Sequence, residues 1–468
     1  MSSNSGTIIN RANATAPFLN AIKSRNSKSL PELYSAEVNT EPMAQSRVEV
    51  ESSSSAGYNR TMRISLPRYG LLNRLYLHTK FGAASYAEST SNGVQFVPFI
   101  GAFAYREIRL MYNGSVLAKL NPETIVSDLW KNSSEREKKH LQELLGAFKT
   151  VTGATVSTTS NEGKFSGTNA LRQIVNSKSD GKSDYYCPLD FFFSAKHSPN
   201  RALDLSVLAN EVILEVDVEA QSNIWKGTGT VTSLPTLDNV SAVCYLTEFD
   251  VETEKQYRSL QYQAGGSPLT QLAFDTTHVV VASNVSHSTA DTAIDIKLNQ
   301  FTGQVYKLVV YATLTDNFGT NIHRIQPGSI KEIQLKATGS NIYNSDELSD
   351  KEDLVESYHN GGDFLPFNED DDNYAVMSAC NPLNFYEINF KHPYDMSKVS
   401  ASGSVALGQL SVPTLRVVVP GASQDAGFGN LQTVLAAAVD IHVVAYHTTL
   451  ISYNTNTSGS THIRQIMN

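Results

Sequence analysis

Two runs of alternating apolar and polar residues dominate this chain, and each closes a block of shorter runs of the same kind. The first is Glu211–Glu219, where valine or leucine fills every second position and acidic residues fill most of the others. The second is Val439–His447. Because side chains alternate between the two faces of a strand, such a run places one face in a core and the other in water. Two tandem blocks predict two β-sandwiches built on one plan, an organisation more typical of a structural protein than of an enzyme.

The shorter runs give the expected strands of each block. A turn signal supports one hairpin: Asn113-Gly114 separates two alternating segments, and this dipeptide suits a type I′ turn with positive φ at both positions. The first block has strands at Ser46–Glu51, Arg60–Pro67, Leu71–Phe81, Tyr105–Tyr112 and Ser115–Leu120 before its closing run. The second has strands at Val240–Phe249, Gln271–Ala282, Ala293–Leu298, Val305–Thr315, Ile330–Ala337, Tyr386–Phe390, Leu410–Val419 and Leu435–Tyr453. Short strands without crossover helices predict an all-β sandwich or barrel.

Short helices interrupt the β-pattern of the first block. Asn121 can cap a helix that has Pro122 at its first position, and Ser134–Glu137 forms a capping box for a second start. The apolar stripe of the second helix ends at Gly146. Residues 150–182 are rich in Ser, Thr, Gly and Asn, and they are expected to form a long surface loop.

The division into domains follows from composition. We expect an N-terminal arm over residues 1–45, a first sandwich over 46–225 and a second over 226–468, with the Gly, Thr, Ser and Pro of residues 220–238 as the linker. The arm is polar and weakly periodic. Its first 31 residues contain no acidic residue and four basic ones, Arg11, Lys23, Arg25 and Lys28. Such a tail either reaches an anionic partner, such as a lipid surface, or only increases solubility.

Composition excludes several classes of protein. With 468 residues, 41% apolar and 18% charged, the chain has enough apolar material for real cores and too little charge for a disordered protein. The net charge of −9 argues against a general nucleic-acid binder. The three cysteines, Cys187, Cys244 and Cys380, form neither a disulfide framework nor a zinc pattern. We expect no signal peptide and no membrane-spanning run, and therefore a protein made and kept in the cytosol.

A search for catalytic and metal-binding patterns predicts no site. His442 and His447 lie five positions apart on one strand, so they face opposite sides and cannot share a metal. The run Glu369–Asp372 lacks the spacing of an EF-hand loop and is expected to be a solvated acidic loop. Cys187 has no neighbouring base. We therefore predict no catalytic, cofactor-binding or metal-binding residues and no enzymatic activity.

The abundant Tyr and Phe residues leave one alternative open, a two-domain carbohydrate-binding β-sandwich protein. Their positions favour packing instead. Phe191, Phe192 and Phe193 lie together at a strand boundary, and Tyr306 and Tyr311 lie within a strand.

Five stretches in the right order resemble one protein family, the double jelly-roll major capsid proteins of large eukaryotic double-stranded DNA viruses, virophages and polinton-like viruses. The most specific is Cys187-Pro-Leu-Asp-Phe-Phe-Phe-Ser194 followed by Ala202–Leu214. The others are Tyr105–Leu117 leading to a helix with Trp130, Thr247–Lys255, Leu308–Ala312, and Val399–Ser404 followed by Ala436–Leu450.

The resemblance implies a function as well as a fold. It implies two tandem jelly rolls, a homotrimer of pseudo-hexagonal outline, and an icosahedral shell in which such trimers contact one another and minor or penton proteins. It also implies a location in the virion after assembly in the host cytoplasm. The shells of this family often enclose a membrane, which the arm with Arg11, Lys23, Arg25 and Lys28 would suit. No sequence-specific contact with nucleic acid is implied.

Overall fold

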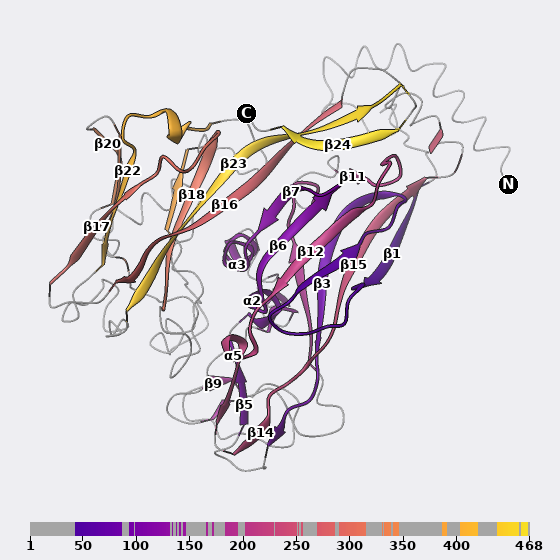
Figure 1. Cartoon of the computed structure of the whole chain (residues 1–468), viewed down its shortest axis with the longest axis horizontal. Helices are drawn as coiled ribbons and strands as arrows, with labels where there is room; N and C mark the ends of the chain where they lie inside the picture. Colours follow the sequence, from indigo (N-terminus) through magenta and orange to yellow (C-terminus); the bar gives the residue numbers. More distant parts are fainter. Residues whose placement is uncertain are drawn as a thin grey trace, which may run out of the picture.

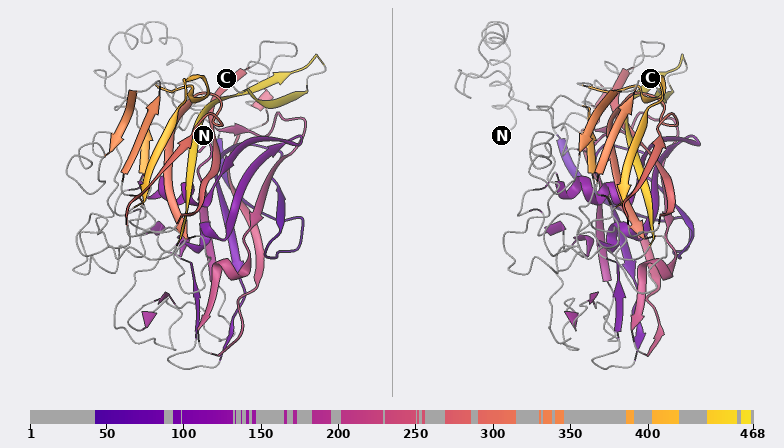
Figure 2. Two further views of the ribbon diagram at one scale, coloured as in Figure 1. Left: turned by 60° about the vertical axis from the view of Figure 1, so that its left-hand side comes forward. Right: turned by 90° about the vertical axis from the view of Figure 1, so that its left-hand side faces the viewer.

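The computed structural model contains two antiparallel β-sandwiches that lie side by side (Figure 1). It describes residues 43–86, 93–97, 99–131, 165–166, 171–172, 183–194, 202–228, 230–249, 269–285, 290–314, 332–337, 340–345, 386–390, 403–419, 438–457 and 460–466, with isolated positions in 133–146 and at 251, 254–255 and 330. Two further views show the same pair of sandwiches, with small β-ribbons beyond one end of the first (Figure 2). The expected arm lies outside these residues except for its last three.

The first sandwich consists of sheets A and B. Sheet A has the strand order β1-β15-β3-β10, with the short strand β11 beside β3, and sheet B has the order β2-β12-β6-β7. The strands are β1 (Met43–Glu51), β2 (Thr61–Ser65), β3 (Leu71–Phe81), β6 (Tyr105–Tyr112), β7 (Ser115–Leu120), β10 (Ser183–Leu189), β11 (Leu203–Asp204), β12 (Val212–Val218) and β15 (Leu237–Phe249). Three of them, β3, β6 and β7, have the predicted bounds.

The second sandwich consists of sheets F and G. Sheet F has the order β16-β23-β18-β21, with β24 beside β23, and sheet G has the order β17-β22-β19-β20. The strands are β16 (Leu269–Val285), β17 (Thr292–Lys297), β18 (Val305–Leu314), β19 (Glu332–Ala337), β20 (Ser340–Ser345), β21 (Tyr386–Asn389), β22 (Thr414–Val419), β23 (Val439–Thr455) and β24 (Thr461–Ile466). A short 3₁₀ helix, η2 (Leu407–Gln409), precedes β22.

The two sandwiches have the same topology. In each, the main path uses eight strands, and the first, third, sixth and eighth form one sheet while the second, fourth, fifth and seventh form the other. The eighth strand lies between the first and the third in both, as β15 does in sheet A and β23 in sheet F. Two four-stranded sheets wound in this way are a jelly roll. The predicted fold class, two tandem jelly rolls with short connecting helices, is confirmed.

Strand pairing moves the boundary between the sandwiches. The sequence placed the start of the second block near residue 226 and assigned it the strand at Val240–Phe249. In the structure that strand is β15, which pairs with β1 along Met43–Glu51 and with β3 along Leu71–Phe81. We therefore propose that the first jelly roll extends through Phe249. The predicted linker instead contains α5 (Gln221–Ile224) and the ribbon strands β13 (Trp225–Thr228) and β14 (Val231–Ser233).

Local sequence signals explain the hairpin and the helices. Asn113 and Gly114 have φ values of 48° and 78°, which is the turn expected between β6 and β7. Helix α3 (Pro122–Lys131) begins at the predicted proline, and α2 (Ile100–Phe103) lies beside it. The described positions of 137–145 are helical and end at Gly146, whose φ of 75° favours glycine. A Cβ on Gly146 would lie 2.6 Å from the Tyr185 ring.

Small ribbons complete the described structure. β13 pairs with β5 (Gly93–Phe96), and β14 pairs with β4 (Ser85–Tyr86). Within the predicted loop 150–182, the structure describes β8 (Phe165–Ser166) and β9 (Leu171–Arg172), which pair with each other. The rest of that loop lies outside the described residues.

The alternation of the run Glu211–Glu219 is confirmed on its apolar face, but its acidic face is only partly in water. Leu214 is fully buried, and Val212, Val216 and Val218 share its face in the core. On the other face Glu215 and Glu219 were expected in water, but both are buried, with 7% and 6% of their surface exposed. They are buried because arginines from neighbouring strands pair with them and cover them.

Candidate functional site: the junction between the sandwiches

The two sandwiches meet over sheet F, whose central strands β18 and β23 are buried on both faces over most of their length. Val443 and Ala445 of β23 belong to the core inside the second sandwich. Their neighbours Val444 and Tyr446 belong to a different core, which is continuous with the interior of the first sandwich. Helix α3 lies between the sandwiches at this point (Figure 1). Separation of the two sandwiches would expose the apolar surface of Val444 and Tyr446 on β23, so the hydrophobic effect favours the joined arrangement.

A buried ionic cluster lies within this apolar junction. Lys307 of β18 places its Nζ 2.9 Å from Oδ1 of Asp128 in α3 and 3.3 Å from Oε1 of Glu387 in β21. The Tyr446 hydroxyl donates to Oδ2 of Asp128 at 2.8 Å, and the Lys307 ammonium lies 4.2 Å from the centre of the Tyr446 ring. The exposed fractions of the Lys307, Asp128 and Glu387 side chains are 11%, 4% and 5%. The cluster therefore joins one residue of the first sandwich to three residues of the second.

Electrostatics keeps Lys307 protonated in this cluster. Burial lowers the pKa of Lys307, but the charges of Asp128 and Glu387 and their hydrogen bonds raise it, and the net shift is upward. Burial raises the pKa of Tyr446 well above its ordinary value, and the charge of Asp128 adds to the shift. Tyr446 therefore remains a hydrogen-bond donor. Removal of one member would leave a charge buried without its partner, which is strongly destabilising.

A second polar contact covers the edge strand β7. The backbone N–H of Lys119 donates to Oδ1 of Asp275 in β16 at 3.0 Å, and the Thr276 hydroxyl donates to the Lys119 carbonyl at 2.9 Å. Gln465 of β24 donates to Oδ2 of the same Asp275 at 3.2 Å. Burial raises the pKa of Asp275, although these hydrogen bonds oppose the shift. The second sandwich thus satisfies backbone groups at an edge that would otherwise be open to another chain.

The hairpin of β23 and β24 extends this contact over the end of the first sandwich. Thr461 forms an isolated bridge with Leu208, and its carbonyl accepts the backbone N–H of Ala209 at 2.9 Å. The Tyr112 hydroxyl at the end of β6 lies 3.2 Å from Nδ1 of His462. Figure 1 shows the hairpin lying across the end of the first sandwich near β7 and β11.

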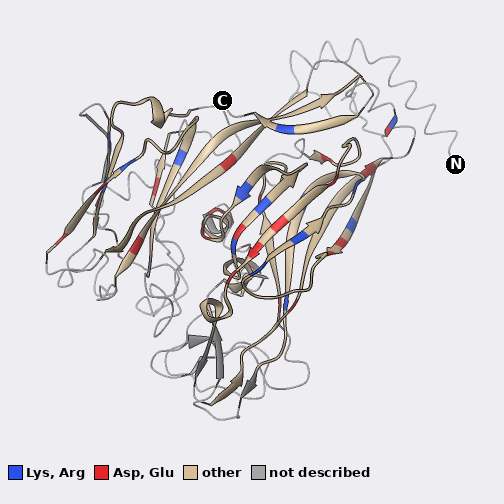
Figure 3. Ribbon diagram, in the orientation of Figure 1, with Lys and Arg blue, Asp and Glu red and all other residues tan. Residues whose placement is uncertain are grey.

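Charged residues form a ladder across the outer face of sheet B. Glu215 of β12 accepts from Nε of Arg63 in β2 at 2.8 Å and lies 2.7 Å from the guanidinium of Arg109 in β6. Arg109 also contacts Asp217 at 3.1 Å and Glu107 at 3.0 Å. Figure 3 shows the opposite charges side by side on β6 and β12. The ladder stabilises three strands in one register and gives the face a charge-paired surface.

Sheet A carries a polar cluster on its outer face, to which each strand of its main path contributes. His78 of β3 has 3% of its surface exposed, and its Nδ1 lies 2.6 Å from Oε1 of Glu49 in β1. Ser241 of β15 donates to the same oxygen at 2.6 Å, and Tyr186 of β10 stacks on the His78 ring at 4.1 Å between centroids. The Ser241 hydrogen bond lowers the pKa of Glu49, while burial opposes it. The cluster ties the sheet together across all four strands.

The residues that the sequence singled out for chemistry do not come together. His442 forms a hydrogen-bonded pair with His278 (2.9 Å between ring nitrogens) and stacks on Tyr311, whereas His447 lies apart from them and is buried. Burial lowers the pKa of His447 to about 4. Neither of its ring nitrogens has a hydrogen-bond partner among the described residues.

The remaining candidates also lack a chemical site. Cys187 and Cys244 are free and buried, and burial raises the pKa of both thiols, that of Cys244 to about 12. Cys380 and the acidic run Glu369–Asp372 lie outside the described residues. Within the part of the chain that the structure describes, no three His, Cys, Asp or Glu side chains are placed to hold a metal ion. The helices of that part include none long and apolar enough to span a membrane.

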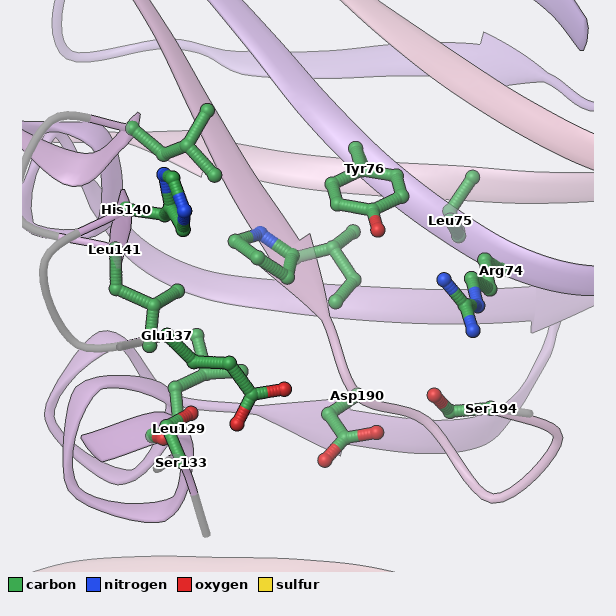
Figure 4. Close-up of a pocket in the computed structure, with 13 residues that line it drawn as sticks. Arg74, Leu75, Tyr76, Leu129, Ser133, Glu137, His140, Leu141, Asp190 and Ser194 are labelled. Carbon is green, nitrogen blue, oxygen red and sulfur yellow. The ribbon is translucent and has the colours of Figure 1, made fainter. Parts of the chain in front are cut away.

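One pocket opens between the helical segment after α3 and sheet A, with a volume of about 260 Å³. His140 and Leu141 line one side, and Arg74, Tyr76 and Ser194 line the other (Figure 4). Its lining also includes acidic residues, so the walls carry both signs of charge. Such a lining does not select one class of ligand.

Comparison with known proteins identifies the fold. No family model matches the chain, and no curated protein matches it by sequence. The structure is similar to the PBCV-1 capsid protein VP54, with a TM-score of 0.60, 13% identity, and coverage of 92% of this chain and 98% of VP54.

Two further solved structures also have a fold similar to that of this chain. The Faustovirus major capsid protein has a TM-score of 0.56 and 11% identity, with 94% of this chain and 98% of that chain covered. A chain in the structure of the Sputnik virophage has a TM-score of 0.52 and 10% identity, with 91% and 88% covered. Over nearly its whole length, this chain has the double jelly-roll fold of the major capsid proteins of large double-stranded DNA viruses and virophages.

Proposed function

We propose that this chain is a viral major capsid protein. One observation carries the proposal: two jelly rolls of identical strand order lie side by side on one chain, joined through a sheet whose central strand β23 contributes to both hydrophobic cores. The structures it resembles over more than nine-tenths of its length include the PBCV-1 capsid protein VP54 and the Faustovirus major capsid protein. The proposed role is structural and includes no reaction on an external substrate.

The unit of assembly in this proposal is a homotrimer. Three chains with two equivalent sandwiches each present six sandwiches around one axis, which gives a block of pseudo-hexagonal outline. Such blocks tile an icosahedral shell through contacts with neighbouring capsomers and with minor or penton proteins. The buried junction with its ionic cluster supports this proposal, because a repeating lattice requires the two sandwiches of every chain to keep one relative orientation. The chain is then a component of the virion, assembled in the host cytoplasm.

The size and outline of the purified protein test this proposal. Native mass spectrometry should find a complex of three chains of 51.2 kDa each, and negative-stain images should show particles of hexagonal outline. A monomer across micromolar concentrations would contradict the proposal. A monomer that binds glycans would favour the carbohydrate-binding alternative instead.

The N-terminal arm is proposed to face an inner membrane. Its basic residues Arg11, Lys23, Arg25 and Lys28 suit an anionic surface, and they lie outside the described residues. Because the first described strand, β1, begins at Met43, a chain that lacks residues 1–42 keeps every described strand of both sandwiches. We expect this truncation to leave the trimer folded and to reduce both shell formation and binding to anionic vesicles. Aggregation of the truncated chain would show that the arm is needed for folding.

A further inference from the structure

The ionic cluster of the junction has the composition of a reaction site as well as that of an ion pair. An amine, Lys307, lies in hydrogen-bond contact with a carboxyl group, Asp128. A second carboxylate, Glu387, contacts the same amine, and the Tyr446 hydroxyl donates to the other oxygen of Asp128. Tyr306, whose ring lies 5.8 Å from that of Tyr446, is also buried in the junction. Lys307, Asp128, Glu387 and Tyr446 supply a nucleophile, an electrophile, a proton carrier and a hydrogen-bond donor, in that order.

We propose that Lys307 and Asp128 form an intramolecular isopeptide bond that joins the two jelly rolls covalently. Nζ of Lys307 attacks the carboxyl carbon of Asp128, and the new amide links β18 of the second sandwich to α3 of the first. Tyr446 stabilises the charge that develops on Oδ2 during the attack. Glu387 takes two protons in turn from the Lys307 nitrogen, one before the attack and one after it, and delivers each to the departing Oδ1 of Asp128, which leaves as water.

The reaction balances without any added reagent. An ammonium group and a carboxylate give one amide and one water molecule: the C–N bond forms, one C–O bond of Asp128 breaks, and two of the three ammonium protons leave with the oxygen. Glu387 ends in the protonation state in which it began. No oxidant, reductant or cofactor takes part.

The buried position of the cluster favours the amide over the separate ammonium and carboxylate groups. In water an ammonium and a carboxylate remain apart because hydration stabilises both ions, and an apolar junction removes most of that hydration. The fold also holds the reacting groups in contact, which replaces a bimolecular encounter by an intramolecular one. Because the net pKa shift of Lys307 is upward, little free amine is present at any moment. The bond is therefore expected to form slowly after folding and to accumulate.

The location gives the bond a structural consequence. Asp128 and Lys307 are 179 residues apart, and each belongs to a different jelly roll. A covalent link between them restricts the unfolded chain as a disulfide does, without requiring an oxidising compartment. The relative orientation of the sandwiches would then persist under conditions that break ion pairs.

Mass spectrometry of the denatured full-length chain tests the proposal independently of capsid assembly. We expect the aged wild-type protein to be lighter than its sequence by one water molecule, and a digest to contain one branched peptide with both Asp128 and Lys307. Freshly refolded protein should begin at the full mass and lose the water with time. Glu387→Gln should remain at the full mass, while Lys119→Arg, a matched change of a lysine outside the cluster, should lose water as the wild type does.

The wild-type measurement decides the question even where a variant fails to fold. A folded wild-type chain that keeps its full mass after long incubation, with Asp128 and Lys307 recovered in separate linear peptides, would show that the cluster is an ion pair only. Loss of water from Glu387→Gln at the wild-type rate would refute the role given to Glu387.

Discussion

Glu215 provides the sharpest test of how the first jelly roll is held together. The alternation of its strand predicts a solvated glutamate whose replacement by alanine changes stability by no more than about 0.5 kcal/mol. The structure instead buries the side chain to 9% exposure between Arg63 and Arg109, with contacts of 2.8 and 2.7 Å. We therefore expect Glu215→Ala to destabilise the protein measurably.

The expected loss of stability in Glu215→Ala depends on how exposed its partners Arg63 and Arg109 are. Breaking a fully buried ion pair costs about 3–5 kcal/mol, whereas an exposed pair contributes at most about 1 kcal/mol. Arg63 is 67% exposed and Arg109 is 24% exposed, so water screens both partners in part. We expect Glu215→Ala to lower the free energy of unfolding by about 1–2 kcal/mol, between these limits. For a domain of this size that corresponds to a decrease in Tm of roughly 2–8 °C.

Urea denaturation and thermal melting measure this effect, with Glu211→Ala as the matched control. Glu211 lies on the same alternating run and is exposed, so its replacement should stay within about 0.5 kcal/mol of the wild type. A double-mutant cycle with Arg109→Met should give a positive coupling energy with Glu215. Equal stability of the Glu215 and Glu211 variants would show that the ladder on sheet B contributes nothing and that the reasoning from burial is wrong.

Two further predictions concern the cores. Leu214→Ala should cost about 3–5 kcal/mol because Leu214 is fully buried in the central part of sheet B, and Leu214→Asp should abolish soluble protein, as expression and urea melts would show. His447 binds a proton more weakly in the folded chain, where its pKa is about 4, than in the unfolded chain, where it is about 6.5. The unfolded state therefore binds more protons between these values, and stability should fall as pH is lowered from about 6.5 to about 4. His447→Leu should flatten that part of the stability profile, and an unchanged profile would contradict the assignment.

Local sequence patterns predicted the strand bounds and turns that depend on residues close together in the chain. Alternation gave the bounds of β3, and the Asn113-Gly114 turn fixed the hairpin of β6 and β7, because both signals lie within a few residues. The assignment of β15 to the second sandwich was wrong because strand pairing depends on residues far apart in the chain. Its pattern identifies a strand, but the choice of sandwich depends on β1, some two hundred residues away. Polar composition at residues 220–238 suggested a linker, whereas the stretch contains α5, β13, β14 and the start of β15.

The junction cluster was missed because no local pattern brings its members together. Asp128 and Tyr446 are 318 residues apart, and sequence alone does not show that α3 faces sheet F. A weaker signal was present. Lys307 interrupts the otherwise apolar strand Val305–Leu314, and Glu387 lies inside the short strand Tyr386–Asn389. A single charge within an apolar strand indicates a buried partner, although it does not identify that partner.

The order of strands in sheets A and F has a consequence for synthesis on the ribosome. In each sheet the last strand of the jelly roll lies between the first and the third: β15 separates β1 from β3, and β23 separates β16 from β18. Sheet A therefore remains incomplete until Phe249 has left the ribosome, and sheet F until nearly the whole chain has done so. Such long-range pairing folds late, and a prematurely terminated chain lacks the central strand of a sheet. If the chain is the proposed capsid protein, truncated translation products would be excluded from the shell, because they lack the central strand of a sheet.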